Sequence, residues 1–155
     1  MKILEIKELD SPIKSILMRL WNEEYPTTLG MANVSDFEYY LENIAPSNHF
    51  LLYQQSEVAG WVAEFTRAGE TWFAMIIRRD FQQMGFGQLG LEHLKSRNKS
   101  LNGWVVDNDS YARIDGSLYL SPVSFYKKNG FEVQKDIRLE TETLSAIKIT
   151  WTKLN

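Results

Sequence analysis

The residues best suited to chemistry lie in one stretch, from Met75 to Leu89, where an apolar run passes into a turn with two glycines. The turn reads Gln82-Gln83-Met84-Gly85-Phe86-Gly87-Gln88, and a helical pattern follows it. The first N–H groups of such a helix have no partners, and with the positive end of the helix dipole they form an anion site. Glycine lets the chain turn sharply and lets a bulky phosphate come close. We therefore predict a phosphate site in this turn.

A second segment with chemical potential is Phe125-Tyr126-Lys127-Lys128-Asn129-Gly130-Phe131. It follows Ser121-Pro122, a pair typical of a helix start, and Asn129-Gly130 is a helix C-cap pattern. An unperturbed tyrosine titrates near ~10, so the Tyr126 hydroxyl keeps its proton at neutral pH and can donate it. Taken alone, this segment favours Tyr126 as a packing aromatic on a short helix.

The two segments together resemble the two signatures of the GCN5-related N-acetyltransferase (GNAT) superfamily. Gln82-x-x-Gly85-x-Gly87 is similar to the loop that holds the pyrophosphate of acetyl-CoA in that family. Residues 125–131 look like its aromatic-Tyr-x-x-x-Gly-Phe segment. The resemblance implies that acetyl-CoA is the co-substrate, that no metal is needed, and that these residues bind the cofactor: Ile76, Ile77, Gln82, Gln83, Met84, Gly85, Phe86, Gly87 and Gln88.

The resemblance also implies catalytic roles. Tyr126 would return a proton to the leaving thiolate as a general acid, and the main-chain N–H of Ile77 would polarise the thioester carbonyl. The base stays open. Glu64 is a carboxylate within an apolar strand, where burial would raise its pKa. Asp107 at the end of a later strand is the rival, and an amine that binds already neutral needs no base.

One departure from the family pattern concerns the connection from Asp107 to Leu120. Members of the family commonly carry asparagine seven residues before the tyrosine, where this sequence has Tyr119. Asn108 lies too far upstream to replace it without a rearranged loop. Long loops in compact domains are often functional, and we expect this one to border the acceptor site.

The totals predict one folded domain over residues 1–155, since hydrophobic residues make up 44% and charged residues 24%. No apolar run approaches the ~20 residues of a membrane span, and the start lacks a signal-peptide pattern, so a cytoplasmic location is expected. The chain has no cysteine, which excludes disulfides and a thiol-bound acetyl intermediate. The isolated His49 and His93 are expected to be structural.

The net charge of −3 is unevenly distributed. Residues 1–70 hold 5 Lys/Arg and 11 Asp/Glu, whereas residues 71–155 hold 12 and 9. The basic half, which carries the glycine turn, suits a polyanionic cofactor, and the acidic half suits a small cationic amine. A sequence pI of 5.4 argues against nucleic acid. A P-loop is excluded because Gln88-Leu89 follows Gly87 in place of lysine and serine or threonine.

The patterning predicts an α+β protein (α/β in the broad sense) with the GNAT fold. We expect a mixed, mostly antiparallel sheet of six to seven strands, flanked by about four helices, with the central strands splayed. Ser35 and Glu38 form a capping-box pattern, and Leu101 falls on one face of the third helix. The predicted strands are 2–7, 49–54, 57–66, 71–78, 103–106, 131–139 and 146–151, and the predicted helices are 12–24, 35–44, 86–99 and 123–128.

Two other functions fit the same patterns. One is a non-catalytic acyl-CoA-binding or regulatory module with the same fold, and the other is an interaction domain whose glycine turn only starts a helix. The resemblance also allows a homodimer, with Trp151 on the terminal strand contributing to the interface. No nucleic-acid or membrane partner is expected.

Overall fold

The computed structural model describes residues 1–155, and its elements follow the predicted order. The strands are β1 (Lys2–Ile6), β2 (Ser47–Gln54), β3 (Glu57–Arg67), β4 (Glu70–Ile77), β5 (Ser100–Val105), β6 (Glu132–Glu140) and β7 (Ser145–Thr152). The helices are α1 (Ser11–Glu24), α2 (Val34–Asn43), α3 (Phe86–Arg97) and α4 (Val123–Lys128), with short 3₁₀ turns η1 (Thr27–Leu29) and η2 (Arg79–Phe81).

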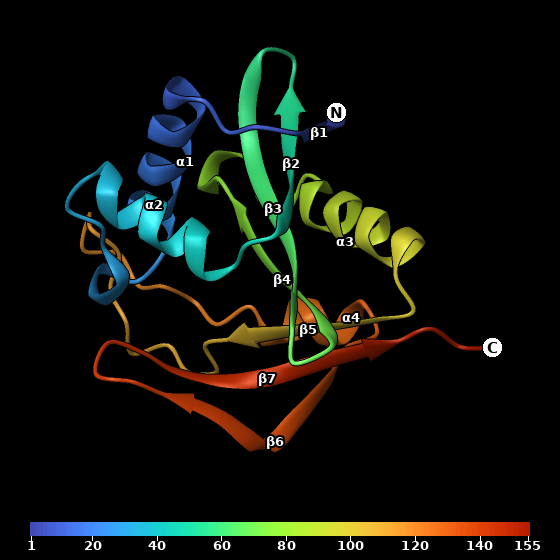
Figure 1. Cartoon of the computed structure of the whole chain (residues 1–155). Helices are drawn as coiled ribbons and strands as arrows, with labels where there is room; N and C mark the ends of the chain where they lie inside the picture. The colour runs from blue at the N-terminus through green and yellow to red at the C-terminus, as the bar shows by residue number, and fades with distance from the viewer.

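All seven strands form one mixed sheet in the order β1-β2-β3-β4-β5-β7-β6 (Figure 1). The strands β1 to β4 pair antiparallel in sequence order, and β5, β7 and β6 form a second antiparallel group. Only β4 and β5 are parallel neighbours. The predicted fold class is confirmed, because strand number, mixed pairing and helix number all agree with the GNAT fold.

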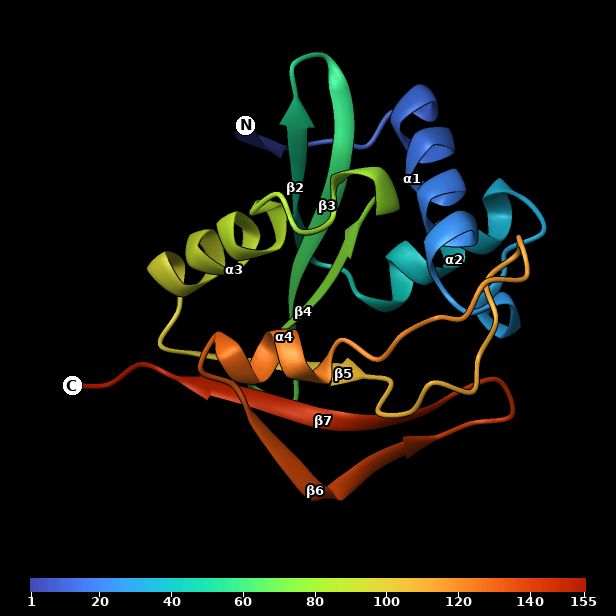
Figure 2. The ribbon, with the colours of Figure 1, turned by 180° about the vertical axis from the view of Figure 1, so that it is seen from behind.

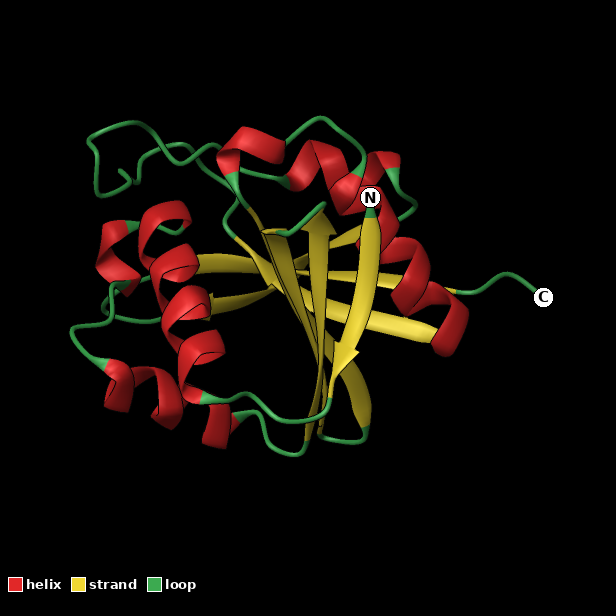
Figure 3. Ribbon diagram, turned by 90° about the horizontal axis from the view of Figure 1, so that it is seen from above, coloured by secondary structure: helices red, strands yellow, loops and turns green.

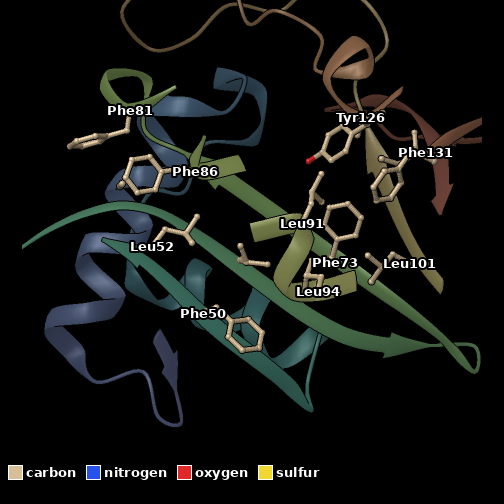
Figure 4. Packing of buried hydrophobic residues seen from close by; sticks show 14 of the residues in the cluster. Phe50, Leu52, Phe73, Phe81, Phe86, Leu91, Leu94, Leu101, Tyr126 and Phe131 are labelled. Carbon is tan, nitrogen blue, oxygen red and sulfur yellow. The ribbon is translucent and has the colours of Figure 1, made fainter. Parts of the chain in front are cut away.

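Helices cover both faces of the sheet (Figure 3). On one face α1 and α2 pack against the sheet through a buried cluster that contains Leu17, Leu20, Trp21, Phe37, Leu51, Trp61, Ala63, Phe65, Trp72 and Ile76. On the other face α3 and α4 pack against a second cluster, shown in Figure 4, that contains Phe50, Leu52, Val62, Phe73, Phe86, Leu91, Leu94, Tyr126 and Phe131. No helix combines the length and apolar character that a membrane crossing requires.

The junction between β4 and β5 is splayed, as expected. Their ladder consists of a single pair, Trp72 with Asn102, whose side-chain amide also bonds the Thr71 carbonyl at 3.1 Å. Beyond Trp72, β4 continues to Ile77, about 17 Å further at the usual rise per residue. The sheet is therefore two antiparallel halves that separate toward the end of β4.

Two local predictions are wrong. The cap of α2 is Asn33 and not Ser35: the Asn33 side chain accepts from the Asp36 N–H at 3.1 Å, and Asp36 Oδ2 accepts from the Ala32 N–H at 2.9 Å. This reciprocal pair satisfies the helix start without Ser35. In addition, α3 ends at Arg97, and Leu101 is a fully buried residue of β5.

Candidate functional site

The turn after β4 presents a row of unpartnered peptide N–H groups. It enters α3 at Gly85, which has a φ of 92° and offers no capping side chain. The first bond across the helix start runs from the Leu89 N–H to the Gly85 carbonyl at 3.0 Å. The amides of residues 83–88 donate no hydrogen bond within the protein. Successive free donors at the positive end of a helix dipole are suited to bind a diphosphate.

The side chains of the turn are mostly engaged elsewhere. Gln82 Nε2 donates to the Ile77 carbonyl at 3.1 Å, so this amide closes the turn. The guanidinium groups of Arg78 and Arg79 pair with carboxylates at 2.9 and 2.6 Å. Gln83 is exposed and makes no side-chain bond, and its φ of 64° lies in the left-handed region. Anion binding by the turn therefore depends chiefly on its backbone.

Gly87 is required by packing between α3 and α4. A Cβ there would lie 2.8 Å from Cζ of Phe125, so any larger residue would displace this ring. The sequence analysis explained the glycines of this turn by a sharp bend of the chain and by the approach of a phosphate, and it did not predict the contact with Phe125. Phe86 is 1% exposed and offers the turn only its N–H, while the Gln88 side chain bonds Glu92 at 3.1 Å.

The direction of each peptide group along β4 decides which amides face the opening beside β5. The Arg78 N–H donates to the Ala59 carbonyl of β3 at 2.8 Å. Because the pairs of an antiparallel ladder alternate, Ile76 also turns its peptide groups toward β3, and Ile77 turns its own away. The geometry thus fits the role predicted for the Ile77 N–H. For Ile76 it does not, and Met75 shares the direction of Ile77 instead.

Tyr126 lies on α4, on the same face of the sheet as α3, and is 6% exposed. Its ring centroid is 5.8 Å from that of Phe73 on β4 and 5.4 Å from that of Phe131. The hydroxyl has no hydrogen-bond partner in the protein and points away from Phe131 (Figure 4). Burial raises the pKa of Tyr126 above its ordinary value, so the phenol is protonated at neutral pH and available as a donor.

Glu64 is occupied by other side chains. Burial by itself would raise its pKa, as the sequence predicted, but hydrogen bonds from Arg97, Asn48 and Asn98 outweigh burial, and the pKa of Glu64 is lowered. The residue that pairs with Glu64 on β4 lies four positions before Ile77, so Glu64 is about 13 Å from Ile77 along the strand direction. The prediction of a raised pKa is wrong. Glu64 instead binds the end of α3 to the sheet, at the end of β4 opposite to Ile77.

Asp107, the rival base, is also paired. Both of its oxygens accept from the Arg138 guanidinium, at 2.8 and 3.0 Å. These hydrogen bonds lower the pKa of Asp107. A carboxylate held in this way by a fork of two donors is a weak proton acceptor.

The connection between β5 and α4 folds back over the end of α1 (Figure 2). The Thr27 N–H donates to the Ala112 carbonyl at 2.9 Å, and an ion pair joins the loop to η2. Tyr119 contacts Tyr25 edge-on, with ring centroids 6.4 Å apart. Burial raises the pKa of the Tyr25 phenol well above its ordinary value, and the phenols of Tyr40, Tyr119 and Tyr126 add to this effect.

Glu24, the last residue of α1, is a buried carboxylate that the sequence analysis did not single out. It is 7% exposed, and its Oε2 accepts from the Arg79 N–H at 3.0 Å. Its Oε1 is closed off from solvent without a hydrogen bond, and Arg79 Nε lies 3.9 Å away. Such an unpaired buried oxygen costs about 1–3 kcal/mol. Helical spacing after Leu17, Leu20 and Trp21 was the signal that could have placed Glu24 on the buried face.

The two histidines are in packing contacts away from the turn. Trp61 Nε1 donates to His49 Nδ1 at 3.1 Å, and burial lowers the pKa of His49 to about 4. The His93 ring lies edge-on to Phe50, with centroids 4.6 Å apart. The structure brings no group of three His, Cys, Asp or Glu side chains into an arrangement that could hold a metal ion.

Comparison with solved structures identifies the fold. No protein-family model matches the sequence, and no curated protein is significantly similar to it in sequence. An aminoglycoside 6'-N-acetyltransferase complexed with coenzyme A superposes with a TM-score of 0.75 at 13% identity, over 100% of this chain and 98% of the other. The chain therefore has the GNAT fold of the N-acetyltransferases.

Two further similar structures are named for acceptors that differ from each other, an aminoglycoside and a ribosomal protein. The aminoglycoside 6'-N-acetyltransferase from Enterococcus faecium gives a TM-score of 0.67 at 16% identity, over 100% of this chain and 98% of the other. The ribosomal-protein-alanine N-acetyltransferase from Brucella melitensis gives 0.68 at 11% identity, over 98% and 99%. At these identities the likeness establishes the fold.

Proposed function

We propose that the chain is an acetyl-CoA-dependent N-acetyltransferase that acetylates a primary amine by direct attack in a ternary complex. The observation that carries the proposal is the row of free amides at residues 83–88, placed where β4 separates from β5. Gly87 of this row lies against Phe125, whose ring centroid is 5.2 Å from that of Tyr126. The coenzyme A complex of a similar structure supports the choice of cofactor. The names of the three similar structures described above, each an N-acetyltransferase, support the choice of reaction.

Each part of the site has one task in this proposal. The turn amides bind the pyrophosphate, and the peptide groups of Met75 hold the pantetheine arm. The Ile77 N–H donates to the thioester oxygen, where negative charge develops as the amine attacks. The Tyr126 hydroxyl gives its proton to the departing sulfur as the C–S bond breaks. The attacking nitrogen loses one proton as the C–N bond forms, and this proton restores the Tyr126 hydroxyl, so the products are the amide, the thiol and neutral Tyr126.

The acceptor side is formed by α1, η1 and the loop 107–120. Residues 1–70, which include α1 and η1, carry the excess of acidic side chains, and the aromatic rings of Tyr25 and Tyr119 meet there. Carboxylates and aromatic faces both attract cations. We therefore propose a small cationic amine as acceptor. We also propose a cytoplasmic location, as the sequence analysis expected. The predicted homodimer through Trp151 remains a prediction.

The test is acetyl-CoA-dependent thiol release with a panel of polyamines, aminoglycosides, amino acids and peptides, comparing the wild type with Tyr126→Phe. The substitution removes only the hydroxyl, which has no partner in the protein, so packing should be kept. We expect kcat to fall about 10²-fold, the usual size of a general-acid contribution. The affinity for coenzyme A should stay within about twofold, because the ring remains in place.

Two results would contradict this account. If the wild type binds coenzyme A but releases no thiol with any amine, the non-catalytic acyl-CoA-binding module is the better description. If Tyr126→Phe turns over at the wild-type rate, the enzyme assignment survives, but the acid is not Tyr126.

A further inference from the structure

The acceptor side of the site contains a carboxylate whose geometry calls for a partner. Glu24 is more than nine-tenths buried, yet only Oε2 is hydrogen-bonded. Buried polar atoms are almost always paired, and an exception needs a physical explanation such as a missing ligand or a catalytic role. Oε1 of Glu24 is such an exception.

The nearest cation is directed away from this oxygen. Arg79 Nη1 bonds Asp115 Oδ2 on the loop 107–120 at 2.6 Å, while Arg79 Nε stays 3.9 Å from Glu24 Oε1, beyond hydrogen-bond length. Glu24 Oε1 is therefore within ion-pair distance of Arg79 but accepts no hydrogen bond.

The position of Glu24 connects it to the proposed reaction centre. Its Oε2 bonds the Arg79 N–H, and this amide is two residues beyond Ile77, at most about 7 Å along the chain. The adjacent Tyr25 is in contact with Tyr119 of the loop 107–120. The free oxygen thus lies where α1, η2 and the loop meet, beside the opening of the sheet.

We propose that Glu24 Oε1 binds the ammonium group of the acceptor and takes its proton, so that the neutral amine can attack the thioester carbon. This proposal rests on the proposed function. One N–H bond of the ammonium breaks and one O–H bond forms on Glu24. After the attack the nitrogen loses a second proton, Tyr126 gives its own proton to the sulfur as the C–S bond breaks, and the second proton restores the Tyr126 hydroxyl. Because Oε1 is closed off from solvent, the groups that cover it must move to admit the acceptor.

The proposal also narrows the acceptor class. A single carboxylate oxygen with aromatic rings beside it suits a primary ammonium on a slender chain, which can both bond the oxygen and lie against a ring. Glu24 takes the role that the sequence analysis left open between Glu64, Asp107 and no base. Glu64 and Asp107 accept hydrogen bonds from arginine side chains, whereas Oε1 of Glu24 accepts none.

The experiment compares wild type, Glu24→Gln and Glu23→Gln in thiol release with spermidine, kanamycin and glycinamide, and measures coenzyme A affinity and Tm in parallel. Glutamine keeps the acceptor for the Arg79 N–H and the side-chain volume, and it removes only charge and basicity. Glu23 is the exposed neighbour and serves as the matched control. For Glu24→Gln we expect KM for the amine to rise about tenfold or more and kcat to fall, with coenzyme A affinity unchanged.

The results distinguish a failure of this inference from a failure of the proposed acetyltransferase function. Wild-type-like kcat/KM in Glu24→Gln overturns the inference alone, and so does an equal loss of coenzyme A affinity and Tm, which would mark a structural role. A wild type that binds coenzyme A without any turnover overturns the proposed function and the inference with it. Glu24→Asp, which keeps the charge, should recover part of the activity that Glu24→Gln loses.

Discussion

At the scale of single residues, the site depends on peptide groups more than on charged side chains. The spacing of Gly85 and Gly87 was enough to predict the turn, because positive φ and close approach favour glycine there. It could not show that Ile76 faces β3 and Ile77 faces the opening. That choice depends on strand register, and a shift of one residue would reverse it.

The backbone site predicts a charge effect at Met84, which is 49% exposed in the turn. Met84→Glu places a carboxylate beside the free amides, where it repels a diphosphate by about 1–3 kcal/mol at surface dielectric values. We expect the Kd for coenzyme A, measured by calorimetry, to rise about tenfold at low salt and less at high salt.

The matched control at this position is Met84→Gln, which has the same shape without the charge. It should bind coenzyme A within about twofold of the wild type. Equal affinities for the Glu and Gln variants would mean that no anion is bound at this turn.

The carboxylates show where residue-level prediction reaches its limit. The strand pattern placed Glu64 on a buried face, and it is buried, but its partners Arg97 and Asn98 lie at and just after the end of α3. A sequence pattern cannot supply such tertiary neighbours. For Glu24, helical periodicity predicts burial, but only the fold shows that Oε1 has no partner.

At the scale of elements, the sequence predicted which helices and strands exist and in what order, but it did not predict the residues at which they begin and end. The start of α2 shows why: the sequence offers both Asn33 with Asp36 and Ser35 with Glu38, and both pairs have capping-box spacing. The structure uses the first pair. The position of Leu101 was equally ambiguous, because a buried leucine fits a helix face as well as a strand.

The α2 cap is tested by stability measurements. Asn33→Ala removes the acceptor for the Asp36 N–H, and we expect it to lower the free energy of unfolding by about 1 kcal/mol. Ser35→Ala, one residue inside the helix, should change stability by less than about 0.5 kcal/mol. Urea denaturation of both variants decides the question, and the reverse ranking would restore Ser35 as the cap.

At the scale of the whole molecule, the fold brings two antiparallel half-sheets together at one parallel pair, and the proposed reaction uses the gap between them. The order of elements and the resemblance to GNAT proteins predicted this architecture. The docking of the loop 107–120 onto Thr27 could not be predicted, because it depends on contacts between segments more than 80 residues apart.

The buried His49 predicts how global stability depends on pH. Burial lowers its pKa from 6.5 to about 4, so the folded state binds a proton less readily than the unfolded state. Stability is therefore full above pH 6.5 and falls as the pH drops from 6.5 toward 4. Between pH 7.5 and 5 the expected loss from this group is about 2 kcal/mol.

Urea denaturation at pH 7.5 and 5 measures this loss. His49→Asn keeps an acceptor for Trp61 Nε1 and has no group that titrates in this range, so its stability should change much less between the two pH values. An equal pH dependence in wild type and variant would assign the effect to other groups.

The central claim is that coenzyme A binds at the free amides of the turn and along the open edge of β4. The most direct measurement is a ¹H–¹⁵N NMR titration of the labelled protein with coenzyme A. The account predicts the largest shifts at the amides of residues 83–88, with Met75 and Ile77 also affected. Shifts centred elsewhere on the sheet, or an unchanged spectrum at saturating coenzyme A, would contradict it.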